Sequence, residues 1–160
     1  MSFSIAMTGY LLLAWAMNVA PTLALVQAPP LHPKVEFRLA ESEPTPGLIE
    51  GRVPDNGRKV YMHPGAIITN KDIVEANVRE DPYMLHAYQI TVVFIEEAAK
   101  RMSRTTQMHS HGLLVILIDD KIVSALRITA PFYREAAISG PWTTKEQAER
   151  LAAELTQKSG

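Results

Sequence analysis

The chain has 160 residues, a formal net charge of −1, 47% hydrophobic and 21% charged residues, and no cysteine. This length predicts one domain with an appendage, and the near-zero charge gives no electrostatic reason to expect binding to nucleic acid or to an anionic membrane surface. The absence of cysteine excludes disulfides, thiolate metal sites and a cysteine nucleophile.

The N-terminal stretch is uncharged and apolar. Residues 5–26 carry no charge, and the first Lys or Arg of the chain is Lys34. A helix of that length, at about 1.5 Å per residue, would cross a hydrocarbon core of roughly 30 Å. We therefore expect an N-terminal apolar helix within residues 1–28, either a cleaved signal peptide or a single membrane anchor, and a Pro-rich linker at 29–34. Both alternatives predict a periplasmic or other extracytoplasmic location, whereas a buried core helix would be interrupted by Pro21.

The first part of the body reads as short strands and loops. Residues 35–39 alternate apolar and charged side chains, which is typical of a half-buried strand. Residues 41–57 are rich in Pro and Gly and predict a loop, and residues 59–62 predict a short strand. Thr69, with Asp72 three residues later, predicts a brief helical turn that starts at Thr69 and runs through Val74.

A strand and an amphipathic helix follow. Residues 87–94 alternate cleanly and include several β-branched residues, which predicts a strand. Residues 95–107 predict a helix, because their apolar members recur at helical spacing. These members are Ile95, Ala98, Ala99 and Met102. The pairs Glu96–Lys100 and Glu97–Arg101 are expected to form ion pairs on the other side.

The next unit is a hairpin. Residues 113–118 are six apolar residues without alternation, so we expect a strand that is covered on both faces. A two-residue turn at Asp119 and Asp120 requires positive φ at both positions and leads into a strand at 121–128. A short strand is expected at 136–140.

The last predicted element is a helix at 143–155. Thr143 and Glu146 have the spacing of a capping box, and four apolar residues form one stripe. These four are Ala148, Leu151, Ala152 and Leu155. The predicted fold class is α+β: a mostly antiparallel sheet of four to five strands with two amphipathic helices on one face, in addition to the N-terminal apolar helix.

Five stretches, taken in order, resemble the head subdomain of the first periplasmic domain of the SecD/SecDF protein-export family. These stretches are residues 35–39, 68–73, 88–102, 118–125 and 138–152. The resemblance implies a SecD P1-head-like α+β domain at 35–160, an extracytoplasmic setting and a possible accessory part in protein export.

The chain also departs from the family pattern. Asp120 stands where the family has a turn glycine, Leu126 where it has proline, and Trp142 where it has phenylalanine. The charged membrane helices that serve proton coupling in SecD and SecF have no counterpart in this sequence, so we do not expect a complete proton-driven translocase component.

Candidate site residues are few. His109 and His111, with His63, are the basis of an alternative in which the domain binds a metal or hydrolyses a substrate, but no full ligand set or catalytic motif is visible. We therefore predict no catalytic residue, no cofactor and no metal site, and we do not expect an enzyme.

Two loop aromatics, Phe132 and Tyr133, are the candidate partner contacts, because aromatic side chains on a loop are costly unless they bury against something. The alternative is that they fold over the sheet edge. The resulting functional hypothesis is a non-catalytic domain that binds unfolded or exported polypeptide, or an envelope protein, with membrane contact through the N-terminal segment if it is not cleaved. A structural dimerisation module remains a further alternative.

Overall fold

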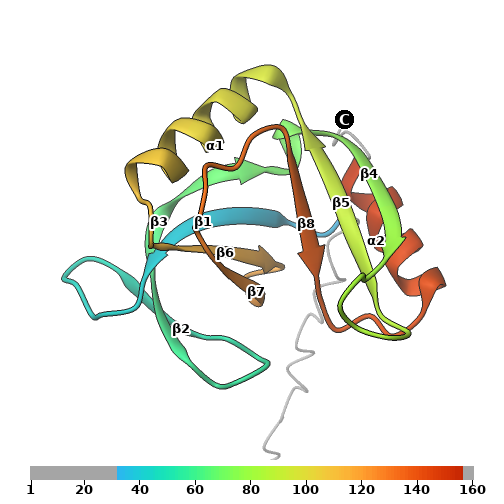
Figure 1. Cartoon of the computed structure of the whole chain (residues 1–160), viewed down its shortest axis with the longest axis horizontal. Coiled ribbons are helices and arrows are strands. Elements are labelled where there is room, and N and C mark those ends of the chain that lie inside the picture. The colour runs from blue at the N-terminus through green and yellow to red at the C-terminus, as the bar shows by residue number, and fades with distance from the viewer. Residues whose placement is uncertain (1–31, 157–160) are drawn as a thin grey trace, which may run out of the picture.

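A computed structural model describes residues 32–156, which form eight strands in two antiparallel sheets, two α-helices and one short 3₁₀ helix (Figure 1). The predicted N-terminal apolar helix at 1–28 lies outside these residues, as does the first half of the linker at 29–34. Within residues 32–156, neither helix has the length and apolar character that a membrane span requires.

The larger sheet has five strands and is built around β1. Its members are β1 (Val35–Glu41), β2 (Ile49–Arg52), β3 (Lys59–Thr69), β6 (Leu113–Ile118) and β7 (Lys121–Arg127), in the order β2-β3-β1-β6-β7. β6 is covered on both faces as predicted: Leu114 and Ile116 join one hydrophobic cluster, while Leu113 and Val115 join the other. This arrangement explains why its sequence lacks alternation.

The turn between β6 and β7 confirms the two-residue prediction. Asp119 and Asp120 have φ of 50° and 61°, both in the left-handed region. The Asp119 carboxylate accepts a hydrogen bond from Lys34 N at 2.8 Å, and Asp119 N donates to Lys34 O at 2.9 Å. These bonds fasten the turn to the chain entering β1.

The five-stranded sheet is curled, so that its two edge strands approach each other. A Cβ atom placed on Gly51 of β2 would lie 2.5 Å from Cδ1 of Ile122 in β7. The concave face encloses the smaller hydrophobic cluster, formed by Ala40, Val53, Val60, Met62, Leu113, Val115 and Leu117. β2 falls inside residues 41–57, so the prediction of a loop is wrong for that part. The strand was missed because it has only four residues and one of them is glycine.

The smaller sheet has three strands and was not expected as a separate sheet. Its members are β4 (Ile73–Glu80), β5 (Tyr88–Phe94) and β8 (Glu135–Ser139), in the order β4-β5-β8. β4 was missed because a register irregularity between Ile73 and Glu75 breaks the period of two. The α+β class and an antiparallel sheet of five strands are confirmed, whereas the second sheet of three strands was not predicted.

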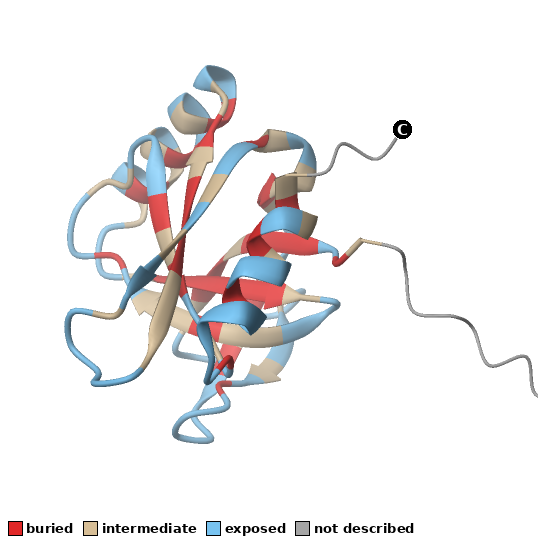
Figure 2. Ribbon diagram, turned by 90° about the vertical axis from the view of Figure 1, so that its right-hand side faces the viewer, coloured by how far each residue is buried: buried red, intermediate tan, exposed pale blue. Residues whose placement is uncertain are grey.

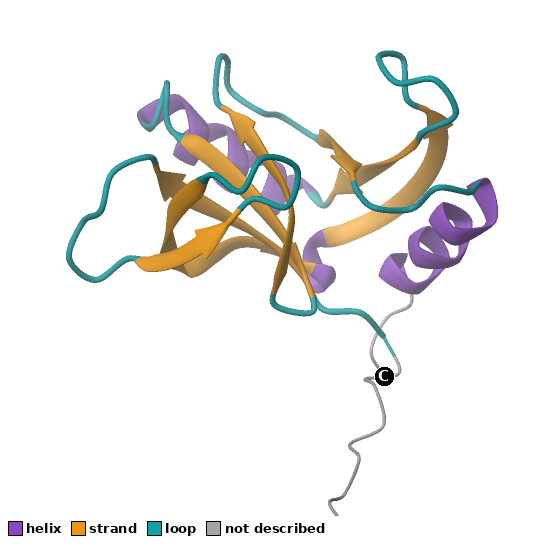
Figure 3. Cartoon of the chain, turned by 90° about the horizontal axis from the view of Figure 1, so that it is seen from below, coloured by secondary structure: helices purple, strands orange, loops and turns teal. Residues whose placement is uncertain are grey.

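The two helices do not cover one face of one sheet, which corrects the expected layering. Helix α1 (Glu96–Met108) packs against β3, whereas α2 (Lys145–Thr156) packs against β4 and β5. Figure 3 shows the two groups of strands with one helix against each. A single main core joins both sheets and both helices, and Phe37 and Phe94 meet there edge to face with ring centroids 5.5 Å apart. Figure 2 shows the buried residues concentrated on the inward sides of the strands and helices.

Side-chain hydrogen bonds cap the starts of η1 and α2. The predicted turn at Thr69 is confirmed as the 3₁₀ helix η1 (Asn70–Asp72), where Thr69 N donates to Asp72 Oδ2 at 2.8 Å. In α2 the cap lies one residue later than predicted, because Gln147 N donates to Thr144 Oγ1 at 3.3 Å. The predicted stripe is confirmed: Ala148, Ala152 and Leu155 are buried, and Leu151 is half-buried.

Candidate contact surface

The segment between β7 and β8 runs alongside α1 and is fastened at two points. Phe132 N donates a hydrogen bond to Oγ1 of the fully buried Thr106 at 3.0 Å. Two residues later, Arg134 O accepts a hydrogen bond from Phe94 N at 2.9 Å. The backbone of the segment is therefore held at both ends of Tyr133.

The two predicted contact residues are separated by this geometry. Phe132 is half-buried and packs against the main core, whereas Tyr133 is 68% exposed. Adjacent side chains on an extended segment point to opposite sides, so a core residue at 132 places residue 133 outward. Phe132 therefore packs onto the domain, and of the two residues Tyr133 is the one that is exposed and available for contact with a partner.

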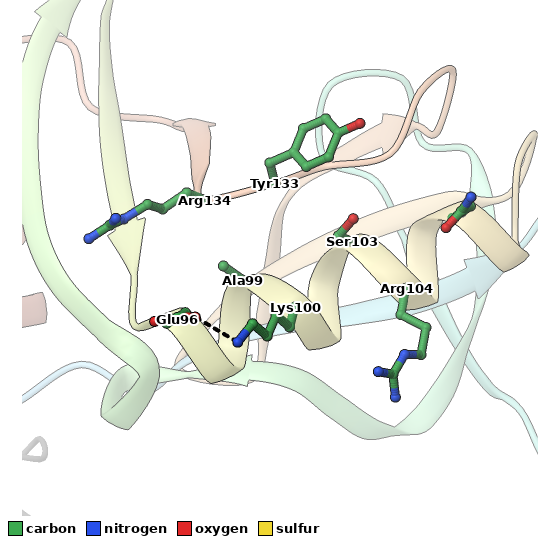
Figure 4. A pocket seen from close by; sticks show the side chains of 8 residues that line it. Glu96, Ala99, Lys100, Ser103, Arg104, Tyr133 and Arg134 are labelled. Atoms are coloured by element: carbon green, nitrogen blue, oxygen red, sulfur yellow. Dashed lines mark ion pairs between the residues drawn. The ribbon is translucent and has the colours of Figure 1, made fainter.

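A shallow groove of about 380 Å³ lies between α1 and this segment (Figure 4). Its lining comprises Glu96, Ala99, Lys100, Ser103, Arg104, Gln107, Tyr133 and Arg134. Ala99 and Ser103 point toward the segment from one face of α1, and the Tyr133 side chain projects from the segment on the side away from the helix in this view. The small side chains leave room next to an aromatic ring, which suits an apolar side chain of a bound chain.

Charged groups surround the groove. Lys100 Nζ lies 2.6 Å from Glu96 Oε1, confirming the first predicted helix pair. The hydrogen bond that Lys100 donates to Glu96 holds the pKa of the Glu96 carboxyl below its ordinary value and raises the pKa of Lys100. The second predicted pair is wrong: Arg101 instead contacts Asp72, at 2.8 Å, and donates to Ile67 O at 2.7 Å. Arg101 is thus directed away from the groove, toward β3 and η1.

The histidines do not form a metal centre. The rings of His63 and His109 have centroids 6.4 Å apart, and His109 Nδ1 donates to Thr105 O at 2.8 Å. Within the described part of the chain, which includes all five histidines, no three His, Asp or Glu side chains converge as metal ligands. The metal-binding form of the histidine-based alternative therefore has no three-ligand cluster to support it in residues 32–156.

Sequence reasoning missed a second exposed apolar surface, at the β4–β5 loop. Tyr83 and Leu85 are each 94% exposed, and Met84 is 63% exposed. The signal that would have indicated it is the run of uncharged residues from Pro82 to His86 between two strands. Only the strand that follows this run, residues 87–94, was recognised as an element.

Comparison with known proteins agrees with the fold. The model of the family described as SecDF, P1 head subdomain, matches residues 47–159. No curated protein matches the chain. Strand β1, the centre of the larger sheet, precedes the matched range.

Two solved structures share the fold. One is of SecDF, described as a membrane component that enhances protein export; it has a TM-score of 0.60 and 19% identity, and the match covers 78% of this chain and 62% of that chain. The other is of SecDF in a super-membrane-facing form, with a TM-score of 0.59, 19% identity, and coverage of 77% of this chain and 18% of that chain. This chain thus spans about 62% and 18% of their lengths, and at these identities the likeness concerns the fold alone. Because the family model covers more than half of the sequence, the chain belongs to the SecDF P1 head subdomain family.

Proposed function

We propose that this domain works outside the cytoplasm as a non-catalytic accessory of protein export, and that it binds unfolded polypeptide in the groove beside α1. Family membership supports the link to export. The observation that carries the binding proposal is Tyr133, 68% exposed on a segment that is fastened on both sides. A preorganised aromatic side chain gives contact area without a large cost in conformational entropy.

The groove suits a weak and sequence-tolerant ligand. It is open and shallow, its floor is made of small side chains, and the charges on its rim have both signs. Such a surface contacts apolar side chains of an extended chain without demanding a particular sequence. Because the main contacts are apolar, we expect binding to tolerate salt.

Sheet edges offer a less suitable route for an extended ligand. In residues 32–156, β4 pairs with β5 and with no other strand, so one of its edges lacks a strand partner. However, β4 has the register irregularity near Val74 and carries Glu75, Arg79 and Glu80, and these features discourage strand addition. The groove is therefore the favoured site.

The test is a titration of a labelled, permanently unfolded, water-soluble polypeptide with the full chain. We expect saturable binding with a Kd on the order of 100 μM that changes little between low and high salt. Tyr133→Ala should weaken binding about fivefold or more, since truncating an aromatic anchor typically costs more than ~1 kcal/mol. Tyr83→Ala removes an even more exposed tyrosine from another surface and serves as the matched control, with no change expected.

Absence of saturation up to millimolar polypeptide, or equal weakening by the two variants, would contradict the proposal. The alternative of a dimerisation module makes a different prediction, namely a sedimentation coefficient that rises with protein concentration in the absence of any ligand.

A further inference from the structure

The tip of the β4–β5 loop is an exposed apolar knob, here called the loop tip: Tyr83, Met84 and Leu85. All three side chains are largely exposed, and their neighbours Pro82 and His86 are exposed as well. Large apolar side chains that stand together in water are unfavourable, so such a cluster indicates a surface that is covered during function. The proposed polypeptide groove lies beside α1 and does not include this loop.

The loop tip is held in place by its own backbone. The Asp81 carboxylate Oδ1 accepts hydrogen bonds from Tyr83 N at 2.8 Å and from Met84 N at 3.2 Å. Asp81 N donates to Ala87 O at 2.9 Å, and Ala87 N donates to Met84 O at 3.3 Å. His86 adopts a φ of 59° and completes the reversal. The three side chains thus project outward from a turn whose backbone is fixed by hydrogen bonds.

The loop is also braced against the segment that leads into α2. Trp142 Nε1 donates a hydrogen bond to Tyr88 O, and Ser139 Oγ lies 3.4 Å from Asp81 Oδ2. Figure 1 shows the loop projecting from the end of the three-stranded sheet beside that segment. These contacts hold the base of the loop against the rest of the domain.

The size of the knob argues against a protein partner. Three side chains of this size expose at most about 500 Å², while a specific protein interface buries about 800 Å² on each side. This deficit applies equally to a second copy of the chain. A lipid bilayer, by contrast, accommodates a convex knob without a matching cavity.

The distribution of charge fits a bilayer surface. The tip itself is uncharged, and the three residues that precede Pro82, namely Arg79, Glu80 and Asp81, carry charges of both signs. Arg79 and Glu80 are exposed and would stop insertion at the level of the headgroups. Because these three residues together carry no net positive charge, we do not expect binding to require anionic lipid, and a zwitterionic bilayer surface is sufficient for it. Tyrosine is one of the side chains that favour the interface between water and hydrocarbon.

We propose that the loop tip inserts into the headgroup region of a lipid bilayer and thereby orients the domain on the membrane surface. This proposal is independent of polypeptide binding, because it concerns other residues on another element. It also does not require residues 1–28 to span the bilayer.

The chain contains no cysteine, so a single cysteine introduces one selective label. In the Leu85→Cys variant of the 160-residue chain, an environment-sensitive fluorophore at position 85 should shift its emission to shorter wavelength when phosphatidylcholine vesicles are added. The shift should be nearly the same when about 20% of the lipid is anionic, because the contact is apolar and does not depend on the surface charge of the bilayer. The same label at Asp55, an exposed loop residue elsewhere, should not shift. Adding Tyr83→Ser and Met84→Ser to Leu85→Cys should lower the partition coefficient at the label by about tenfold or more.

Three results would overturn the proposal. If vesicles shift neither label, or shift both equally, the loop tip is not the membrane contact, whatever residues 1–28 do. If the Leu85 label shifts with protein concentration in the absence of lipid, the loop tip binds a second copy. If it shifts with the unfolded polypeptide and not with vesicles, it belongs to a polypeptide site, and the Tyr133→Ala titration then decides separately whether the groove also binds.

Discussion

The hydroxyl of Thr106 joins α1 to the segment that carries Tyr133: it accepts a hydrogen bond from Phe132 N at 3.0 Å and donates one to Met102 O at 2.8 Å. Thr106 is fully buried, so no solvent replaces it in this role. The helix interior therefore supplies a polar anchor for a loop, and the position of Tyr133 depends on it.

Thr106→Val tests this anchor, because valine keeps the shape and removes the acceptor. Leaving Phe132 N without its partner should lower the free energy of unfolding by about 1–3 kcal/mol. Denaturant unfolding measures the loss, and the half-buried neighbour Thr105→Val is the matched control, expected to change stability by less than about 1 kcal/mol. Equal effects of the two substitutions would show that the anchor carries no special stability.

Closure of the curled sheet depends on the missing side chain at Gly51. Gly51→Ala should destabilise the protein by about 1 kcal/mol or less, because the new methyl group would meet Ile122 Cδ1 at 2.5 Å and Met62 Cε at 3.1 Å, and both atoms are the ends of side chains that can shift. Ile122→Val removes the first of these atoms, so the double variant should recover part of the loss. The control is Gly65→Ala, since a Cβ there meets nothing within 4 Å. Strictly additive effects at positions 51 and 122 would mean that the two edge strands do not touch.

The β6–β7 turn contains a strained aspartate. Asp120→Gly should raise the free energy of unfolding by about 1 kcal/mol, since Asp120 has a φ of 61° and glycine adopts this conformation without a steric penalty. The substitution also removes the exposed contact between Asp120 and Lys34 at 3.0 Å, which stabilises the fold little and is weakened further by salt. Unfolding in roughly 1 M NaCl isolates the backbone effect. A lower denaturation midpoint under those conditions would contradict the assigned turn.

The pair Glu96–Lys100 makes a pH-dependent prediction. Hydrogen bonding from Lys100 lowers the pKa of Glu96 from its ordinary 4.5, with a smaller effect from Arg134. The stabilising effect of the pair is therefore present above pH 4.5 and is lost as the pH falls through the lowered pKa. Lys100→Met should raise the pKa of Glu96 toward its ordinary value, as measured by NMR titration of the Glu96 carboxyl carbon. An unchanged titration would mean that the pair is not formed in solution.

Local patterns in the sequence were sufficient for the elements that depend on local physics. Sequence patterns predicted the hairpin around Asp119 and Asp120 and both amphipathic helices. The hydrophobic periodicity and the turn residues that determine these elements lie close together in the chain. The strands that were missed, β2 and β4, are short, exposed or irregular, and they are strands because of the neighbours they pair with.

The division of the strands into two sheets could not be predicted from local sequence patterns. Which strands share a sheet is decided by contacts between distant segments, such as β1 with β6 and β5 with β8. The same limit applies to the candidate site. The sequence indicated Phe132 and Tyr133 together, but only the bond to Thr106, 26 positions earlier, separates the core residue from the exposed one.

Binding of unfolded polypeptide in the groove beside α1 can be followed by NMR chemical-shift mapping of the 160-residue chain during titration with such a polypeptide. The amide signals of residues 96–107 and 132–134 should shift together and saturate with one common Kd. Shifts confined to other surfaces, or no shifts at millimolar polypeptide, would contradict it.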